Sequence, residues 1–262
     1  MKPILKWPGG KAKLAEQIIE RFPATFNRYV EPFCGAAAVW CALQPERAWL
    51  NDRNRELINL YRVLKNGGAR YVRTILGAWS VSEADYLLLR SLSRPKNAES
   101  EWRAARTLYL NRYGFNGLYR VNSKGDYNVP YGARKKPVNW SRVDLEGFGK
   151  ALKWTKLTSY DFESVLLNCG QGDVVYCDPP YDGGFTAYTK EGFSLLDQER
   201  LAVAATQAVR QGAHVLVSNS NTDAIRAIYR GDNLRVVEAR RSISTKASSR
   251  GMVQELLIEV RP

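Results

Sequence analysis

Short apolar runs alternate along the chain with stretches that have the spacing of amphipathic helices. Seven of these runs are rich in Val, Leu, Tyr or Trp and have the length of strands. Strands that alternate with helices predict a doubly wound α/β fold with a mostly parallel, seven-stranded sheet, and the last two runs predict a hairpin closed by a long basic loop. The runs cover residues 28–30, 48–50, 157–160, 173–177, 214–217, 234–237 and 256–260.

The alternation stops in the middle of the chain. This part begins with three stretches of helical spacing and continues as a loop-rich segment of aromatic and basic residues. Such a break in a β/α pattern indicates an inserted second domain. We therefore predict a main domain of residues 1–61 and 153–262 and an inserted domain of residues 62–152. The helical stretches are residues 62–76, 81–93 and 99–110.

Polar side chains lie at the ends of four predicted strands. Asp52, Asp161 and Asp178 end three of them, and Ser218 with Asn219 ends a fourth. Ligands of doubly wound sheets bind at the carboxyl ends of the strands, where an acidic residue commonly accepts hydrogen bonds from ribose hydroxyls. We therefore expect a cofactor site there, with Asp52 in that role. A helix cap is the alternative for Asp52 and for Asp161.

The charge of the chain favours a polyanionic partner. Lys and Arg number 39 against 26 Asp and Glu, which leaves a net charge of +13. Such a field is typical of nucleic-acid binders, although a merely soluble basic protein would share it. The positions of the basic residues are more informative than the net charge, because six of them are interleaved with tyrosines and a phenylalanine that can stack on bases. The basic residues are Arg112, Arg120, Lys124, Arg134, Lys135 and Lys136.

Composition excludes several classes of site. His214 is the only histidine, which excludes histidine triads and H-E-x-x-H zinc sites. The four cysteines contain no C-x-x-C pair, so we expect reduced, buried thiols and no metal. No apolar run is long enough to span a bilayer and no signal-peptide region follows Met1, so we expect a soluble intracellular protein without a membrane partner.

The string Asp178-Pro179-Pro180-Tyr181 directly follows a strand-like run. Prolines fix φ and end strands, so a rigid turn is the structural interpretation. The string also suits activation of an exocyclic amine, whose lone pair is delocalised into a nucleobase. The Asp178 carboxylate and the Pro179 carbonyl can accept the two N–H groups, and Tyr181 can stack on the extruded base. Methyl transfer to such an amine gains its rate from positioning and electrostatics and needs no metal.

Further motifs occur in the order typical of one family. The sequence resembles the Dam family of adenine-N6 DNA methyltransferases, the D12 class with the alpha order of motifs, over nearly the whole chain. The resemblance implies a Rossmann-like methyltransferase fold, S-adenosylmethionine as cofactor and double-stranded DNA as partner, with base flipping at GATC. The motifs cover residues 5–11, 31–35, 51–59, 110–118, 128–130, 161–162, 178–181 and 218–220.

The resemblance assigns cofactor contacts to the start of the chain and to the strand ends. Trp7 and Lys11 are expected to contact the cofactor, with Lys11 paired to its carboxylate. Asp161 is expected to accept the amine of the cofactor's adenine, with Phe162 against the ring. The complete expected set is Trp7, Lys11, Phe33, Gly35, Asp52, Asp161, Phe162 and Asp178.

The turn after the first strand departs from the family pattern. Family members usually carry further glycine after Gly35, where this chain has Ala36, Ala37 and Ala38. We expect the backbone at these alanines to avoid positive φ. A small-residue helix start packed on the sheet is the competing interpretation.

The resemblance assigns DNA contacts mainly to a hairpin in the inserted segment. Phe115 is expected to act as a wedge, and Asn116 to face the orphaned base. Arg120 suits a bidentate pair with guanine, while Leu118 and Pro130 suit contacts with a thymine methyl. The complete expected set is Lys6, Arg112, Phe115, Asn116, Leu118, Arg120, Asn128, Pro130, Arg134, Lys135 and Lys136.

Some assignments stay open at this point. Ala133-Arg134 stands where family members often have Arg-Tyr, and residues 134–136 equally suit generic phosphate contacts. The basic segment 240–250 is either a solvated connection or a clamp on the DNA backbone, and the short glycine-containing segment after Tyr181 is typical of a mobile lid.

Alternative functions also remain. They are a DNA-binding protein that is inactive or has altered specificity, and methylation of cytosine N4 or of RNA adenine. Cytosine enzymes typically have Ser in place of Asp178, which argues against that substrate. The resemblance places the protein on DNA in the cytoplasm of a bacterium or in a phage context, and a restriction-endonuclease partner stays unknown.

Overall fold

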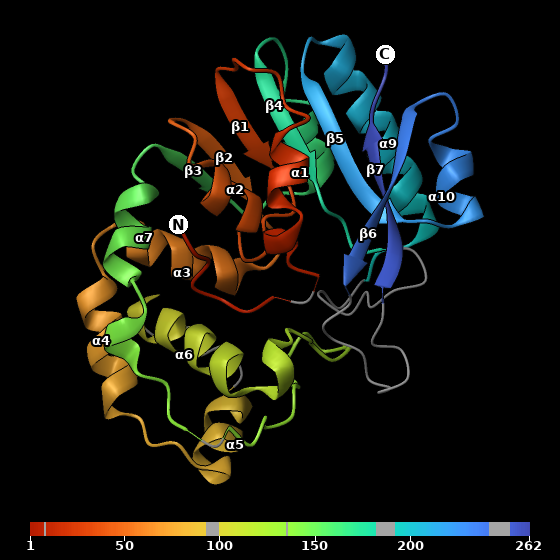
Figure 1. The fold of residues 1–262 in the computed structure, drawn as a ribbon. Coiled ribbons are helices and arrows are strands. Elements are labelled where there is room, and N and C mark those ends of the chain that lie inside the picture. Colours follow the sequence, from red (N-terminus) through yellow and green to blue (C-terminus); the bar gives the residue numbers. More distant parts are fainter. Residues whose placement is uncertain (8, 93–99, 135, 182–191, 241–251) are drawn as a thin grey trace.

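The computed structural model describes residues 1–7, 9–92, 100–134, 136–181, 192–240 and 252–262. Its centre is a seven-stranded sheet of order β3-β2-β1-β4-β5-β7-β6, in which only β7 runs antiparallel to the other strands (Figure 1). The predicted fold class is confirmed. The strands are β1 (Arg28–Glu31), β2 (Ala48–Asn51), β3 (Thr155–Thr158), β4 (Asp173–Cys177), β5 (His214–Ser220), β6 (Asn233–Arg240) and β7 (Met252–Glu259).

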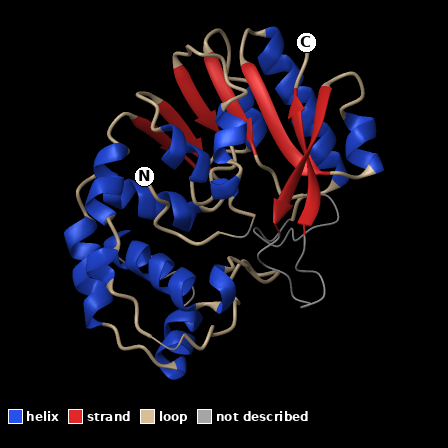
Figure 2. Ribbon diagram, viewed as in Figure 1, coloured by secondary structure: helices blue, strands red, loops and turns tan. Residues whose placement is uncertain are grey.

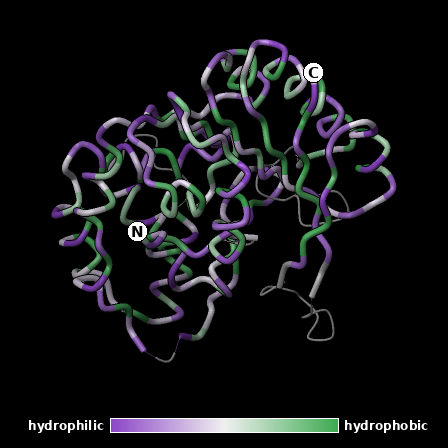
Figure 3. Tube along the Cα trace, turned by 45° about the horizontal axis from the view of Figure 1, so that its top comes forward, coloured by the Kyte–Doolittle hydropathy of each residue, from purple (hydrophilic) through white to green (hydrophobic). Residues whose placement is uncertain are grey.

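Each central strand divides its side chains between two cores. Val174 and Tyr176 of β4 belong to one hydrophobic cluster, and Val175 and Cys177 to the other. This division follows from the two-residue period of a strand, and it requires apolar residues at every position of a sheet covered on both faces. Hydrophobic residues accordingly follow the strands of the sheet in Figure 3.

Helices cover both faces of the sheet (Figure 2). The first cluster lies beneath helices that precede β3 in the chain, and the second beneath helices that follow it. On the first face lie α1 (Ala15–Ile19), α2 (Ala38–Leu43), α3 (Arg55–Lys65) and α7 (Leu145–Ala151). On the second lie α8 (Phe162–Leu166), α9 (Leu195–Arg210) and α10 (Asp223–Ile228).

The segment predicted as an insertion lies beside the carboxyl edge of the sheet (Figure 1). Its buried residues belong to the same cluster as those of α3, so it packs on the first face without a core of its own. The predicted boundary at residue 62 falls inside α3, and the division into two domains stays a prediction. The helices of this segment are α4 (Ala69–Ala78), α5 (Glu83–Ser91) and α6 (Ser100–Tyr113), followed by the short turns η2 (Phe115–Gly117) and η3 (Trp140–Arg142).

Several predicted boundaries differ from those of the structure. The expected helix over residues 62–76 is two helices, because Gly67 has φ +86° and the chain turns there. The expected strand over 157–160 begins and ends two residues earlier. Ser218 and Asn219 lie inside β5, which continues to Ser220. No helix among the described residues is long and apolar enough to cross a membrane.

Candidate active site

Asp178 follows β4 at the carboxyl edge of the sheet. Its Oδ1 atom lies 3.0 Å from the Nζ atom of Lys11 and accepts a hydrogen bond of 2.8 Å from the Ser218 hydroxyl. Its Oδ2 atom has no hydrogen-bond or ion-pair partner among the described residues. One oxygen of the carboxylate is therefore fixed, and the other is available as an acceptor.

Lys11 is almost fully buried in η1 (Lys11–Lys13), with 6% of its side chain exposed. Besides Asp178, its ammonium donates to the Gly9 carbonyl at 2.9 Å and lies 3.7 Å from Glu255 Oε2. The expected pairing of Lys11 with a cofactor carboxylate thus competes with two carboxylates of the chain itself. A buried cation needs such partners, because desolvation alone would penalise it.

A relay of amides fixes the main chain of the Asp-Pro-Pro-Tyr segment. The Pro180 carbonyl accepts a hydrogen bond of 2.9 Å from Gln198 Nε2 of α9. Gln198 Oε1 in turn accepts 2.8 Å from Asn219 Nδ2 of β5, and Asn219 Oδ1 accepts 2.9 Å from the Ser220 amide. Gln198 and Asn219 are both at most 1% exposed. A buried chain of hydrogen bonds of this kind restricts the local geometry and therefore orients the peptide between Pro180 and Tyr181.

Tyr181 lies on the other side of the same segment. Its hydroxyl donates 3.0 Å to Glu255 Oε2, and its ring centroid is 4.8 Å from Lys11 Nζ. Burial, together with the charges of Asp178 and Glu255, raises the pKa of Tyr181 well above its usual range. The hydroxyl therefore stays protonated and acts as a donor.

The turn after β1 joins three predicted cofactor residues. Gly35 has φ +45°, and a Cβ atom there would lie 2.8 Å from the indole of Trp7. Its amide donates 3.0 Å to Asp52 Oδ2, and its carbonyl accepts 2.7 Å from the Tyr61 hydroxyl. Only glycine permits both the backbone angle and the close indole. The structure thus brings Trp7, Gly35 and Asp52 together.

The expectation for the alanines after Gly35 is wrong at one position. Ala37 has φ +54° and ψ +44°, a left-handed conformation immediately before α2. Its amide donates to the Cys34 carbonyl and its side chain is fully buried, so the turn and the surrounding core hold this strained angle. The chain keeps a turn with left-handed backbone despite the missing glycine.

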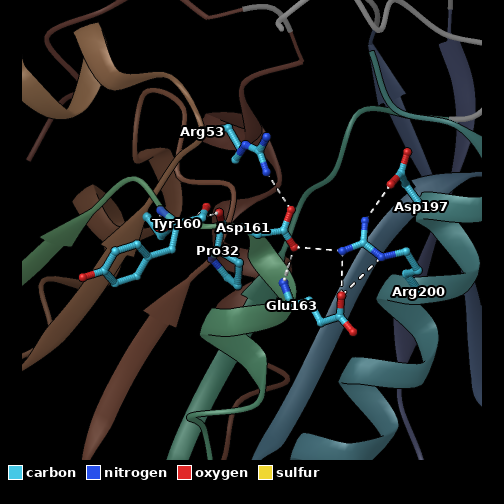
Figure 4. A network of polar contacts seen from close by, with 8 residues as sticks. Pro32, Arg53, Tyr160, Asp161, Glu163, Asp197 and Arg200 are labelled. Atoms are coloured by element: carbon cyan, nitrogen blue, oxygen red, sulfur yellow. Dashed lines mark hydrogen bonds and ion pairs between the residues drawn. The ribbon is translucent and has the colours of Figure 1, made fainter. Parts of the chain in front are cut away.

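Asp161 is the centre of a polar network between β3 and α9 (Figure 4). It caps α8 by accepting the Glu163 amide at 3.1 Å, as its alternative interpretation predicted. Its carboxylate also pairs with Arg53 at 2.7 Å and with Arg200 at 3.1 Å. Nearby, Phe162 is stacked on Phe33 with ring centroids 5.3 Å apart. The residues expected around the adenine of the cofactor therefore contact each other, and both Asp161 oxygens already have cationic partners.

Glu31, at the carboxyl end of β1, is a buried acid that stands in the motif of residues 31–35 but was not among the expected cofactor residues. Its Oε2 atom has no hydrogen-bond partner among the described residues. Burial, and then the charge of Asp178, raises its pKa well above the usual range. An unsatisfied carboxyl oxygen in this position is costly unless a donor completes it.

The first residues of the chain connect the sheet edge to the inserted segment. Asn111 of α6 accepts the Lys6 amide at 2.9 Å and donates to the carbonyls of Lys6 and Gly117. A Cβ atom on Gly117 would lie 2.4 Å from Lys6 Cβ, so these two segments are in direct contact. Trp7 is stacked on Tyr119, with centroids 5.6 Å apart. Lys6 and Trp7 therefore connect the predicted DNA hairpin to the turn after β1.

The segment predicted to bind DNA contains a hairpin, with an antiparallel bridge between Val121 and Tyr127, and its role in DNA binding stays a prediction. Phe115 is 39% exposed, and the neighbouring Asn116 has φ +53°, an angle that non-glycine residues rarely adopt outside functional or tight turns. Arg120 donates to the Asn128 side chain at 2.7 Å and to its carbonyl at 3.0 Å. Two contacts from one residue fix the guanidinium plane and leave other N–H groups for a ligand.

Other predicted DNA residues are placed differently. Arg112 is half-buried and donates to the Ile4 carbonyl, so it holds the N-terminal segment. The pKa of Arg112 is lowered by burial and by Arg134.

The remaining predicted DNA residues differ in exposure. Leu118 is partly buried against the core, whereas Pro130, Arg134 and Lys136 are exposed. The pKa of Lys6 is lowered by partial burial and by Arg134 and Arg112. The prediction for Lys135, the possible lid after Tyr181 and most of the basic segment 240–250 lie outside the described residues.

Comparison with known proteins identifies the family of the chain. The family model of the D12 class N6 adenine-specific DNA methyltransferases matches residues 7–243. The chain belongs to this family. It is 38% identical to the type II methyltransferase M1.LlaDCHI of Lactococcus lactis subsp. cremoris, over 98% of this chain and 95% of that protein. It is 37% identical to a DNA adenine methylase of Vibrio cholerae, over 100% and 96%, and 35% identical to one of Haemophilus influenzae, over 98% and 92%. The predicted family and enzyme class are confirmed.

Within this methyltransferase the sequence missed residues that contact the motifs from elsewhere. Gln198 lies in a helix with many polar residues, and Glu255 lies on an antiparallel strand. Neither is near a motif in the chain, and no local pattern marks them. Asn111 is different, because it stands inside a motif and could have been found as a polar residue in the largely buried second half of α6. Among the described residues no group of three or more His, Cys, Asp or Glu side chains could hold a metal ion.

Proposed function

We propose that this methyltransferase transfers the methyl group of S-adenosylmethionine to N6 of an adenine flipped out of duplex DNA, within GATC. The observation that carries the proposal is the state of Asp178. Lys11 and Ser218 fix its Oδ1 atom, and Oδ2 has no partner among the described residues and can accept a hydrogen bond. An exocyclic amine that donates an N–H requires such an ordered carboxylate with one oxygen able to accept it.

The chain activates the amine through two acceptors. Asp178 Oδ2 accepts one N–H of the exocyclic amine and the Pro179 carbonyl accepts the other, which draws the nitrogen lone pair out of the ring. Gln198 holds the following carbonyl, so the acceptors are ordered before the base arrives. Asp178 Oδ2 is also an acceptor for the proton that the methylated nitrogen must lose. Tyr181 stacks on the flipped base, and its hydroxyl bond to Glu255 restricts the ring.

The residues at the turn after β1 fit the proposed cofactor. Trp7 offers a flat ring against Gly35, Asp52 has lone pairs left after two backbone contacts, and Glu31 has an unpartnered buried oxygen. S-adenosylmethionine would supply an electrophilic methyl group on a positively charged sulfur. Asp161 suits its proposed contact less well, because Arg53 and Arg200 already occupy its oxygens.

The hairpin supplies the proposed DNA contacts. Phe115 is an exposed apolar residue in η2, beside the base of the hairpin, and serves as the wedge, with Asn116 facing the orphaned base. Arg120, oriented by Asn128, reads guanine in the major groove. The Lys6 and Asn111 contacts tie this hairpin to the segment that carries Trp7 and Lys11, so DNA binding and the methyl-transfer site are mechanically connected.

The test is methylation of two plasmids of matched composition, one with GATC sites and one in which each site is changed to GTAC. Methyl-labelled S-adenosylmethionine is the donor, and digestion with enzymes that differ in sensitivity to adenine methylation locates the product. We expect label and altered digestion only on the GATC plasmid. Label elsewhere would remove the GATC assignment and keep the reaction. Cofactor and DNA binding without label on either plasmid would remove the catalytic proposal.

A further inference from the structure

Glu255 lies near the start of β7, where its main chain is opposite Ser220 at the end of β5. Because β7 is antiparallel to β5, its beginning reaches the same edge of the sheet as the carboxyl ends of the parallel strands. The side chain is 11% exposed and its Oε2 atom meets both the Tyr181 hydroxyl, at 3.0 Å, and Lys11 Nζ, at 3.7 Å. One carboxylate thus contacts two groups that also face Asp178.

Lys11 is shared unequally between two carboxylates. It lies 0.7 Å nearer to Asp178 than to Glu255, from 3.0 Å against 3.7 Å. If Lys11 were paired with Asp178 alone, its positive charge would offset the negative charge of Asp178 and make that carboxylate a weaker hydrogen-bond acceptor. A second carboxylate near Lys11 reduces this effect. Glu255 supplies that second carboxylate. With it, the group of Lys11, Asp178 and Glu255 carries one net negative charge when all three are ionised.

We propose that Glu255 is a positioning and charge-balancing residue for methyl transfer. Through the Tyr181 hydroxyl it fixes the ring on which the base stacks. Through Lys11 it keeps Asp178 an effective acceptor and keeps the site negative toward a cationic methyl donor. The proposal rests on the proposed function, because it takes Asp178 as the acceptor and a sulfonium as the donor.

A purely structural role makes a different prediction. In that case Glu255 only neutralises a buried lysine, and its loss would lower stability and weaken all ligands alike. In the proposed role its loss acts on turnover and on the charge of the donor. Binding of S-adenosylmethionine, which is a sulfonium, and of S-adenosylhomocysteine, which is a neutral thioether, separates the two possibilities without requiring activity.

The experiment uses three variants and one control. Glu255→Gln keeps an oxygen acceptor for Tyr181 and removes the charge, whereas Tyr181→Phe removes the hydroxyl and keeps the ring. The double variant shows whether the two effects are independent. Glu259→Gln is the control, because Glu259 is on the same strand and its carboxylate accepts from Asn233, away from the site. Thermal unfolding of each protein checks folding, and Tyr181→Phe still tests the hydroxyl contact if Glu255→Gln unfolds.

For Glu255→Gln we expect a single-turnover rate about tenfold to a hundredfold lower, as for loss of a contact with a charged group. Its preference for S-adenosylmethionine over S-adenosylhomocysteine should fall by roughly tenfold relative to wild type, with DNA affinity unchanged. We expect Tyr181→Phe to lower the rate and to leave that preference unchanged. Glu259→Gln should match wild type in both.

Two results would overturn the inference. One is an unchanged donor preference in Glu255→Gln, and the other is an equal loss of affinity for both cofactor forms and for DNA. The failure of the proposed function would look different. In that case the wild-type protein itself would transfer no methyl group to DNA, or Asp178→Asn would retain normal turnover, whatever Glu255 does.

Discussion

Two aspartates at the same edge of the sheet have opposite environments. Asp178 has its contacts on one oxygen, from Lys11 and Ser218, and its other oxygen has no partner among the described residues. Asp161 has contacts on both, from Arg53 on one oxygen and from Arg200 and a backbone amide on the other (Figure 4). The two side chains differ little in exposure, 20% against 30%.

The difference suggests how to distinguish an aspartate proposed to act in the reaction, Asp178, from one that holds ion pairs and a helix cap, Asp161. Both residues follow strands, so their positions in the chain do not distinguish them. What differs is the remaining capacity to accept a hydrogen bond, which is greater at Asp178, where one oxygen has no partner among the described residues, than at Asp161, where both oxygens are paired. The cation beside Asp178 is also buried and shared with Glu255, whereas Arg53 and Arg200 are 49% and 37% exposed. The predictions below test this contrast.

The largest effect is expected for Asp178→Asn. The substitution keeps the size of the side chain but places an N–H donor or a weaker amide oxygen where the amine needs a carboxylate. The single-turnover rate should fall by at least about a hundredfold, as for loss of one electrostatic contact to a transition state. DNA affinity, measured by fluorescence anisotropy, should stay within about threefold of wild type. The reason is that Asp178 is proposed to act on the amine in the transfer step and not on the phosphate backbone of DNA. Normal turnover would refute the role given to Asp178.

Gln198→Leu should have the next largest effect. It leaves the Pro180 carbonyl and the Asn219 amide without partners in a buried site, at about 1–3 kcal/mol for each group. The loosened segment should also lower the transfer rate by roughly tenfold, because small misplacements of reacting groups are costly. Urea unfolding and single-turnover kinetics measure the two effects.

The matched control is Gln207→Leu, on an exposed position of the same helix. It should change neither stability nor rate. A Gln198→Leu protein that is destabilised but turns over normally would show that the amide relay supports the fold and does not order the acceptors near Asp178.

Much of this architecture was predictable, and the remainder has a physical explanation. The strands were found because their apolar runs reflect a sheet buried on both faces. Asp178 and Tyr181 were singled out because four contiguous residues suit the proposed chemistry, and their roles stay predictions. Glu255 was missed because the expectation of ligands at carboxyl ends ignores an antiparallel strand. Gln198 was missed because a single buried amide in a helix leaves no periodic signal. The positive φ of Ala37 depends on tertiary packing that composition does not show.

Asp52 is a third aspartate at this edge and lies between the two extremes. Its oxygens accept the amides of Gly35 and Asn54, and no ion pair of Asp52 occurs in the part of the chain that the structure describes. Burial raises its pKa from 3.8 to about 6. The folded state therefore binds more protons than the unfolded state between these values, and stability falls as pH rises through them.

Replacement of Asp52 by Asn removes this titration. As pH rises from about 4 to about 7, wild type should lose roughly 1–3 kcal/mol of stability relative to Asp52→Asn. Urea unfolding at several pH values measures the change, and the comparison across pH cancels the constant cost of the lost hydrogen bond. A difference that is independent of pH would show that burial does not raise the pKa of Asp52.

The smallest effect is expected for Asp161→Asn. Asparagine caps a helix as well as aspartate does, so α8 keeps its start and only the ion pairs are lost. Exposed pairs contribute at most about 1 kcal/mol, and salt should reduce the difference from wild type further. Asp161→Ala, which also removes the cap, should cost about 1 kcal/mol more. Unfolding of both variants at low and high salt measures these terms. If Asp161→Asn slowed methyl transfer as much as Asp178→Asn, a carboxylate with both oxygens paired would be as important to the reaction as one with a free oxygen, and the distinction between the two aspartates would fail.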